Sequence, residues 1–224
     1  RLGYVRYIKE RLNMLKLYKR TIIVSIWIFI ILLTSSVTLK ILFPNNDTIS
    51  FLQNYIIGIT CSILVVIITT FLQYKSEYEK VMSEFTSVLR QAILNLTVAL
   101  SYQEKNVEEK FCRRIIEKIK DDFDKFNQLN QSFCCFSKKN HQKYVELAKI
   151  ILKLYVSLIV DSEKSYYDMI KEKIDYPTYI ELAQKTNEFI SDDINKKMIN
   201  ELIKDAQQTL EEKKHIEEMS KKND

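Results

Sequence analysis

The sequence TIIVSIWIFIILLTSSVTL occupies residues 21–39, and FLQNYIIGITCSILVVIITTFL occupies residues 51–72. Neither run contains a charged residue, and twelve of the nineteen residues in the first are Ile, Leu, Val or Phe. A helix rises about 1.5 Å per residue, so about 20 residues cross a hydrocarbon core of about 30 Å. A hydrophobic hairpin inside a soluble protein would still carry charges on its solvated side. The two runs therefore predict a transmembrane hairpin with spans at about residues 21–42 and 51–73.

The scarcity of glycine and proline predicts an all-α protein. Glycine occurs only at positions 3 and 58, and proline only at positions 44 and 177. The chain after the hairpin thus contains no glycine, which tight hairpins, left-handed turns and phosphate-binding loops usually require. We expect residues 74–224 to form a cytosolic α-helical bundle that ends in a long charged helix.

Basic residues are concentrated before the first span. Residues 1–74 contain eight basic and two acidic residues, whereas residues 75–224 contain 26 basic and 27 acidic ones. The connection PNNDTIS at residues 44–50 has no Lys or Arg, so the charge asymmetry predicts a two-pass protein of the inner (plasma) membrane with both termini in the cytoplasm. Because the basic excess lies beside the membrane, direct nucleic-acid binding is not expected.

Residues 1–20 are interpreted as a basic amphipathic juxtamembrane helix. Tyr4, Ile8, Leu12 and Leu15 recur at helical spacing. Basic side chains beside them can lie against anionic headgroups, at about 1 kcal/mol for each charge near the surface. The candidates for this membrane-surface contact are Arg6, Lys9, Arg11, Lys16, Lys19 and Arg20. Alternatively, the same charges act only as the flank that sets the topology.

Small and hydroxylated residues recur four positions apart in both predicted spans. Thr34 and Thr38 share one helix face, and Gly58 and Ser62 share another. This spacing lets two transmembrane backbones approach closely. The four residues are therefore candidates for a span-packing or pore face. Two alternatives stay open, namely packing inside one hairpin and contact between neighbouring chains or with a pore. Without an ionisable residue in mid-span, proton-coupled transport is not expected.

The periodicity of apolar residues predicts the cytosolic helices. The second span should continue into a helix to about residue 105, and the expected loop lies at residues 129–140. Further helices are expected at residues 107–129, 141–175, 178–190 and 193–220.

Local signals set the ends of the later helices. Pro177 is expected to end the helix before it, and Ser191 or Asp192 can cap the last one. The last helix carries a narrow apolar stripe, which fits either a coiled-coil seam or packing within its own chain. The stripe consists of Ile194, Met198, Leu202, Ala206 and Leu210.

No motif for catalysis or cofactor binding is found in the sequence. The one cluster with metal-ligand chemistry is Cys112, Cys134, Cys135 and His141. Its spacing differs from that of common zinc modules, in which ligands are usually two to four residues apart. We expect reduced thiols, no metal, no cofactor and no enzymatic activity.

The plan of the chain resembles that of small two-transmembrane effectors of bacterial anti-phage systems, especially the SLATT class and retron-associated two-transmembrane proteins. The resemblance is carried by RYIKERLNMLKLYKRTIIVSIWIFIILLTSSVTLKIL (residues 6–42), by the second span to Gln73 and by the helix after it. It implies an effector that forms homo-oligomers, or a complex with a defence-system sensor protein, when it is triggered. Such an effector damages the inner membrane, so that the infected cell stops growing or dies.

Two other classes of function remain open. A non-toxic membrane anchor or scaffold would recruit a cytosolic partner through the helical domain. A membrane-bound enzyme is the third class, without support from any residue pattern. Growth of cells after induction of this chain, alone or with its neighbouring genes, distinguishes a toxic effector from an anchor.

Overall fold

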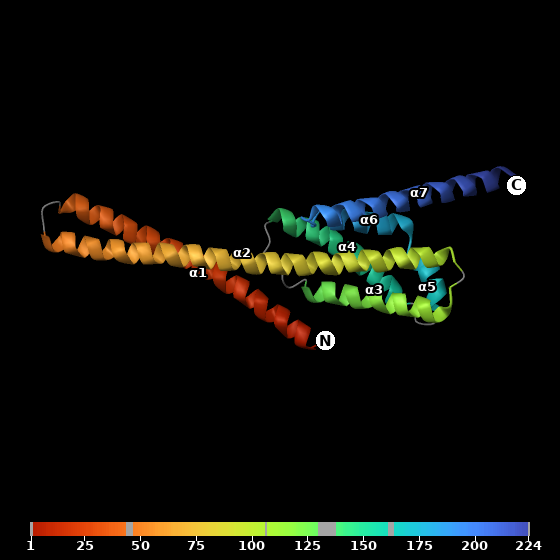
Figure 1. Ribbon diagram of the computed structural model, residues 1–224, viewed down its shortest axis with the longest axis horizontal. Helices are drawn as coiled ribbons and strands as arrows, with labels where there is room; N and C mark the ends of the chain where they lie inside the picture. The colour runs from red at the N-terminus through yellow and green to blue at the C-terminus, as the bar shows by residue number, and fades with distance from the viewer. Residues whose placement is uncertain (1, 44–46, 106, 130–137, 161–163, 224) are drawn as a thin grey trace. The chain divides into compact units, whose positions relative to one another are not determined.

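The computed structural model describes residues 2–43, 47–105, 107–129, 138–160 and 164–223. Over these residues it contains seven helices and no strand, which confirms the prediction of an all-α chain (Figure 1). The helices are α1 (Leu2–Leu42), α2 (Asp47–Gln103), α3 (Glu109–Leu129), α4 (Lys138–Val160), α5 (Tyr166–Lys173), α6 (Tyr176–Asn187) and α7 (Asp193–Asn223).

The chain divides into two compact units, Arg1–Met82 and Ser83–Asp224. Helix α2 contributes to both, because its 57 residues continue past the boundary without a break. The prediction that the second span continues as a helix to about residue 105 is therefore confirmed. The two units are described separately below.

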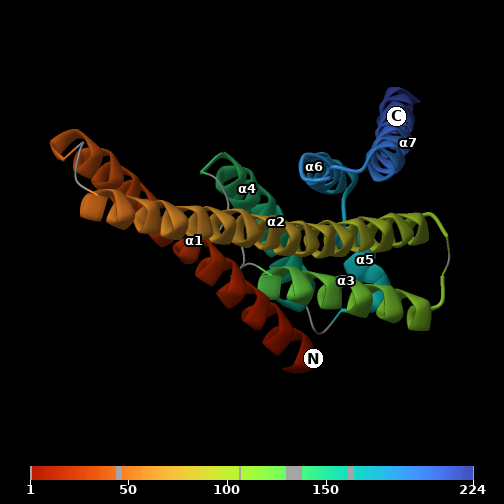
Figure 2. The same ribbon diagram turned by 60° about the vertical axis from the view of Figure 1, so that its left-hand side comes forward.

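The first unit is a hairpin of α1 and the beginning of α2. The two helices run antiparallel and cross in both views (Figures 1 and 2). The predicted juxtamembrane helix and first span form one 41-residue helix, because neither proline nor glycine occurs between Gly3 and Pro44. Both α1 and α2 are long and apolar enough to cross a membrane. Residues 44–46 of the predicted loop lie outside the described residues.

The second unit has an aromatic centre to which several helices contribute. Phe85 of α2 lies 5.7 Å from the ring of Phe126 in α3 and 5.5 Å from the ring of Phe189, which follows α6. Tyr144 of α4 stacks on Phe126 at 5.5 Å. Ring pairs at this separation add about 0.5–1.5 kcal/mol to the burial of their apolar area. The end of α2 is therefore part of the core of this unit.

The helix predicted at residues 141–175 is divided in the structure. Helix α4 ends at Val160 and α5 begins at Tyr166. Ser165 adopts an extended conformation and its side chain accepts a hydrogen bond from the backbone N–H of Asp168. A serine in this position starts a new helix by satisfying an N–H group that has no partner within the helix. The eight residues of the expected loop from 130 to 137 lie outside the described residues.

Pro177 has a different role from the one predicted, since it lies in the first turn of α6. Proline is tolerated there because an N–H group in the first turn has no intrahelical partner. Asp175 caps this helix by accepting a hydrogen bond from the backbone N–H of Thr178 at 2.7 Å. The end of α5 lies at Lys173, two residues before this cap.

Helix α7 begins as predicted and packs through a stripe that overlaps the predicted one. The Asp192 carboxylate accepts a hydrogen bond from the backbone N–H of Ile194, which confirms Asp192 as a cap. The buried residues are Ile199, Ile203 and Ala206. Of the predicted stripe, Ile194 is 80% exposed. Ala206 of the predicted stripe is buried, and Met198, Leu202 and Leu210 are half-buried. The packing face therefore overlaps the predicted stripe and adds Ile199 and Ile203 beside it.

Candidate functional site

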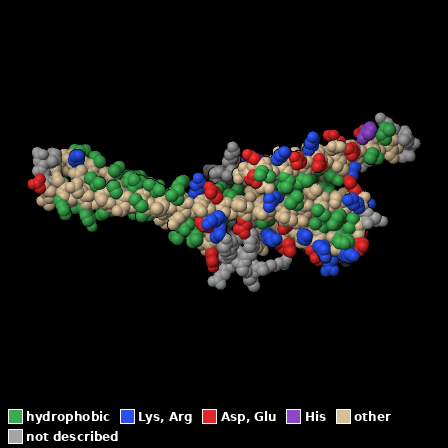
Figure 3. Space-filling view, viewed as in Figure 1, with side chains coloured by type: hydrophobic (Ala, Val, Ile, Leu, Met, Phe, Trp, Pro, Cys, Tyr) green, Lys and Arg blue, Asp and Glu red, His purple; other side chains and the backbone are tan. Residues whose placement is uncertain are grey.

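The outer surface of the hairpin is apolar. In the most apolar stretches of α1 and α2, only 6% and 11% of the residues are buried within the structure. Trp27, for example, is 63% exposed. Figure 3 shows hydrophobic side chains along the hairpin, and acidic and basic side chains over the helices of the second unit. A soluble core helix would bury such side chains, whereas a lipid-facing helix exposes them.

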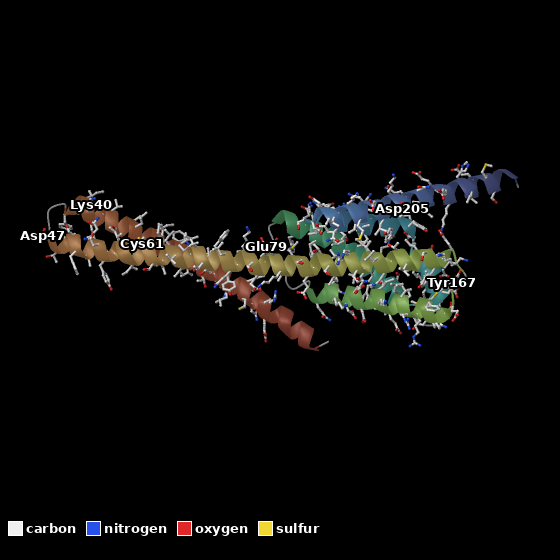
Figure 4. All side chains as sticks on the ribbon, in the orientation of Figure 1. Lys40, Asp47, Cys61, Glu79, Tyr167 and Asp205 are labelled. Carbon is white, nitrogen blue, oxygen red and sulfur yellow. The ribbon has the colours of Figure 1, made fainter. Side chains whose placement is uncertain are left out.

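Charged residues mark the two ends of this apolar surface. Lys40 and Asp47 lie at the closed end of the hairpin, Glu79 lies on α2 towards the other end, and Cys61 lies between them (Figure 4). Between residues 48 and 74 helix α2 carries no charge. These 27 residues span about 40 Å at 1.5 Å per residue, which covers a hydrocarbon core and part of the headgroup layers.

The inward face of the hairpin follows a seven-residue repeat. Buried and half-buried side chains alternate at spacings of three and four, as in the seam of a coiled coil. On α1 they are Ser25, Phe29, Leu32, Ser36 and Leu39, and on α2 they are Gln53, Ile56, Thr60, Ile63, Ile67 and Thr70. The most buried are the small residues Ser36, Thr60 and Thr70. Small side chains at a seam let two helices approach closely.

The four predicted packing residues lie on the outward face of each helix, opposite the face that forms the seam. Thr34 and Thr38 flank Ser36, and Gly58 and Ser62 flank Thr60. A displacement of two residues turns a side chain by about 200° round the helix. The structure accordingly exposes all four residues. Of the two alternatives left by the sequence, packing inside the hairpin does not involve them.

The hydroxyl groups on these outer faces bond to their own helices. Thr34 donates to the carbonyl of Ile30, Thr38 to that of Thr34, and Ser62 to that of Gly58, at 2.8–3.0 Å. These bonds satisfy the hydroxyl donors in an apolar medium. A Cβ added at Gly58 would meet no atom within 4 Å. The Gly58 face is therefore open to another backbone.

The predicted membrane-surface residues divide into three groups. Lys16, Lys19 and Arg20 are exposed. The side chains of Arg6 and Lys9 lie outside the described residues, although their backbones belong to α1.

Arg11 forms the third group, because it pairs with a residue of α2. One of its guanidinium nitrogens lies 3.5 Å from Oε2 of Glu77, and both side chains are largely buried. Lys80 pairs with the other oxygen of Glu77 at 2.7 Å. Sequence reasoning missed Glu77, whose seven-residue spacing from Thr70 would have placed it on the inward face.

The four residues that the sequence offers as possible metal ligands differ in their surroundings. Cys112 is buried in α3, and burial together with the charge of Glu109 raises the pKa of its thiol. His141 is exposed on α4. Cys134 and Cys135 lie outside the described residues, so the expected absence of a metal stays a prediction.

Comparison with known proteins gives no further assignment. The chain matches no family model, no curated protein and no solved structure.

Proposed function

We propose that this chain is a membrane effector of a bacterial anti-phage system, which oligomerises when triggered and permeabilises the inner membrane. In this proposal the hairpin crosses the membrane twice, with both termini in the cytoplasm, and the second unit is a cytosolic helical bundle. The apolar outer surface of α1 and α2 supports membrane insertion. The resemblance of residues 6–73 and of the helix after them to two-transmembrane effectors supports the activity.

The observation that carries the proposal is the open small-residue face around Gly58. Within one chain the two helices already use a different face for their own seam. The outward Gly58 and Ser62 can therefore meet a helix of another chain without opening the hairpin. Close backbone approach at small residues is a general way to associate transmembrane helices.

The hydrogen bonds made by the hydroxyl groups on the outer faces are compatible with both separate and assembled chains. A donor already bonded to the carbonyl four residues earlier can face lipid while the chains are apart. Its oxygen keeps acceptor capacity, so it can receive a hydrogen bond from water or from another chain. In an assembled state, Thr34, Thr38 and Ser62 would supply polar atoms to an otherwise apolar surface.

Substitution of Gly58 by leucine tests this mechanism. Leucine favours the bilayer and meets no atom of its own chain near its Cβ, so the variant should insert and form its hairpin normally. It should hold neighbouring backbones apart and lower the association constant by about tenfold. Cells that express the unmodified protein with its native partners and trigger should admit a membrane-impermeant dye and lose membrane potential, and Gly58→Leu should reduce both effects.

Ile57→Phe is the matched control, since it also adds bulk to an exposed position about 100° round the same helix. It should leave dye entry unchanged at equal expression. If the triggered unmodified protein leaves both dye exclusion and membrane potential intact, the effector proposal is wrong. The non-toxic anchor or scaffold, acting through the second unit, would then take its place.

A further inference from the structure

The second unit carries two apolar faces that are exposed among the residues the structure describes. The first, here called the α4 face, consists of Val145, Leu152, Val156 and Ile159. The second, here called the α7 face, contains Ile216 and Met219 near the end of α7. Leu152 is 53% exposed and Ile216 is 67% exposed. Their spacing places the members of each set on one side of their helix.

The two faces differ in charge. Lys149 and Lys153 border the α4 face, and both are exposed. The acidic residue of that stretch, Glu146, is held by Lys185 at 2.7 Å. The α4 face is therefore apolar with a basic edge.

The α7 face has the opposite sign. Asp205 and Glu212 are exposed and lie on the same side of the helix as Ile216 and Met219, within about 60° of Ile216. Lys213 is turned to one side, where it pairs with Glu104 at 3.2 Å and lies over the ring of Tyr176. The α7 face therefore combines apolar and acidic groups.

Neither face is buried by the residues of its own unit that the structure describes. Helix α7 packs through Ile199, Ile203 and Ala206, which lie about 120° round the helix from the α7 face. In Figures 1 and 2 the last turns of α7 extend clear of the other helices of the unit. None of the described side chains from Glu211 to Ser220 is buried.

We propose that the α7 face of one chain docks on the α4 face of a second copy of this chain. Pairing of two α7 faces would place the acidic residues Asp205 and Glu212 of both chains at one interface, and pairing of two α4 faces would do the same for the basic residues Lys149 and Lys153. Like charges across an interface disfavour both arrangements, whereas the mixed pair joins apolar groups with opposite charges at the edge. The charge pattern thus selects the mixed pair.

Such a contact joins two different surfaces and leaves one of each exposed at the ends. A head-to-tail contact of this kind continues into a ring or an open array instead of stopping at a dimer. The inference rests on the proposal that chains assemble, and it names a second surface that acts together with the membrane hairpin.

The test uses the full chain, purified in detergent, in a Gly58→Leu background that weakens association through the hairpin. Its mass distribution is measured by light scattering. Leu152→Asp disrupts the α4 face and Ile216→Asp the α7 face, and either change should weaken association by between about tenfold and a hundredfold. Each variant alone should remain a single copy, while an equimolar mixture should form a pair and nothing larger, because each partner supplies one intact face.

Charge exchange provides a second measurement. Glu212→Lys should weaken association about threefold to tenfold, and adding Lys149→Glu should restore it. Glu211→Lys is the matched control, since it makes the same charge change about 100° round the helix and should have no effect. Circular dichroism of each variant should match that of the parent, because the altered side chains are exposed.

Three results would overturn the inference: a parent chain that remains a single copy, single variants that still assemble, or a mixture that forms no pair. None of them bears on dye entry by the triggered protein, which separately tests the proposed function.

Discussion

The side-chain amide of Asn95 in α2 donates a 2.6 Å hydrogen bond to Oδ2 of Asp122 in α3, and both residues are buried. Burial raises the pKa of Asp122, although the Asn95 hydrogen bond and the charge of Lys125 oppose the rise. Lys125 lies 3.5 Å from the other carboxylate oxygen. The end of α2 is thus tied to the second unit by a polar contact as well as by its aromatic core.

Replacement of Asn95 should raise the free-energy cost of burying the Asp122 carboxylate. Asn95→Ala removes a donor from a buried charged acceptor, and we expect the free energy of unfolding to fall by about 1.5–3 kcal/mol at pH 7. Urea unfolding of a fragment with residues 83–224 measures it. Asn200→Ala, which alters an exposed amide on α7, should cost only a few tenths of a kcal/mol.

The same site predicts a dependence of stability on pH. Because the folded-state pKa of Asp122 is raised, its contribution to stability is greatest below the ordinary aspartate value of about 3.9 and is lost as pH rises through the folded value. In Asn95→Ala this loss should extend to higher pH, since the opposing hydrogen bond is gone. Asp122→Asn should remove the effect. An unchanged pH profile in both variants would contradict this account.

Helix α5 is short, and its backbone is hydrogen-bonded by side chains from the end of α2 and from the start of α3. Gln103, at the end of α2, donates to the carbonyls of Ile170 and Ile174. Glu109, at the start of α3, accepts from the backbone N–H groups of Tyr166 and Tyr167. An eight-residue helix is marginal alone, so these contacts should hold it in place.

Gln103→Ala should therefore loosen α5 locally. Loss of its two hydrogen bonds should lower the protection of the α5 amides by about tenfold, measured by hydrogen exchange. Gln184→Ala, an exposed change on α6, serves as the control and should leave these amides protected. Equal exchange in α5 for both variants would show that Gln103 does not hold the helix.

The elements that could be predicted from the sequence are those fixed by local patterns. The uninterrupted course of α2 follows from an apolar and amphipathic run without a breaker. The cap at Asp192 follows from a short polar residue before a periodic segment. The break before α5 was also encoded locally, because Ser165 and Asp168 have the spacing of a capping pair.

The packing faces could not be predicted in the same way. Small residues occur on two sides of each span, and spacing alone does not say whether Gly58 or Thr60 faces the other helix. The seven-residue repeat from Gln53 through Thr60 and Ile67 contains that information, but it is weak in a segment that is apolar all round. The bond between Asn95 and Asp122 joins residues 27 positions apart, so it depends on the fold itself.

The proposed topology predicts the result of reporter fusions. In that proposal both termini are cytoplasmic, because basic residues precede the first span and none lies in the connection. Alkaline phosphatase inserted after Asp47 should be active, because the enzyme needs the far side of the membrane, and a fusion after Asp224 should be inactive. A fluorescent protein that matures only in the cytoplasm should give the reverse pattern. Activity of phosphatase at Asp224 would contradict the topology.

The last prediction concerns the minimal folded fragment of the second unit. Residues 83–224 should give a strongly helical circular dichroism spectrum and a cooperative urea transition, with no metal requirement. A fragment with residues 104–224 should not, because it lacks the side chains that α2 buries in the core. These are Phe85, Leu89, Ile93, Leu96 and Leu100. Each contributes about 1.5–3 kcal/mol, so their sum is comparable to the whole stability of a typical domain.

A fragment with residues 83–210 is the control, because none of the described side chains it removes is buried. It should unfold at nearly the same urea concentration as residues 83–224. Cooperative unfolding of residues 104–224 would show that the second unit does not need α2.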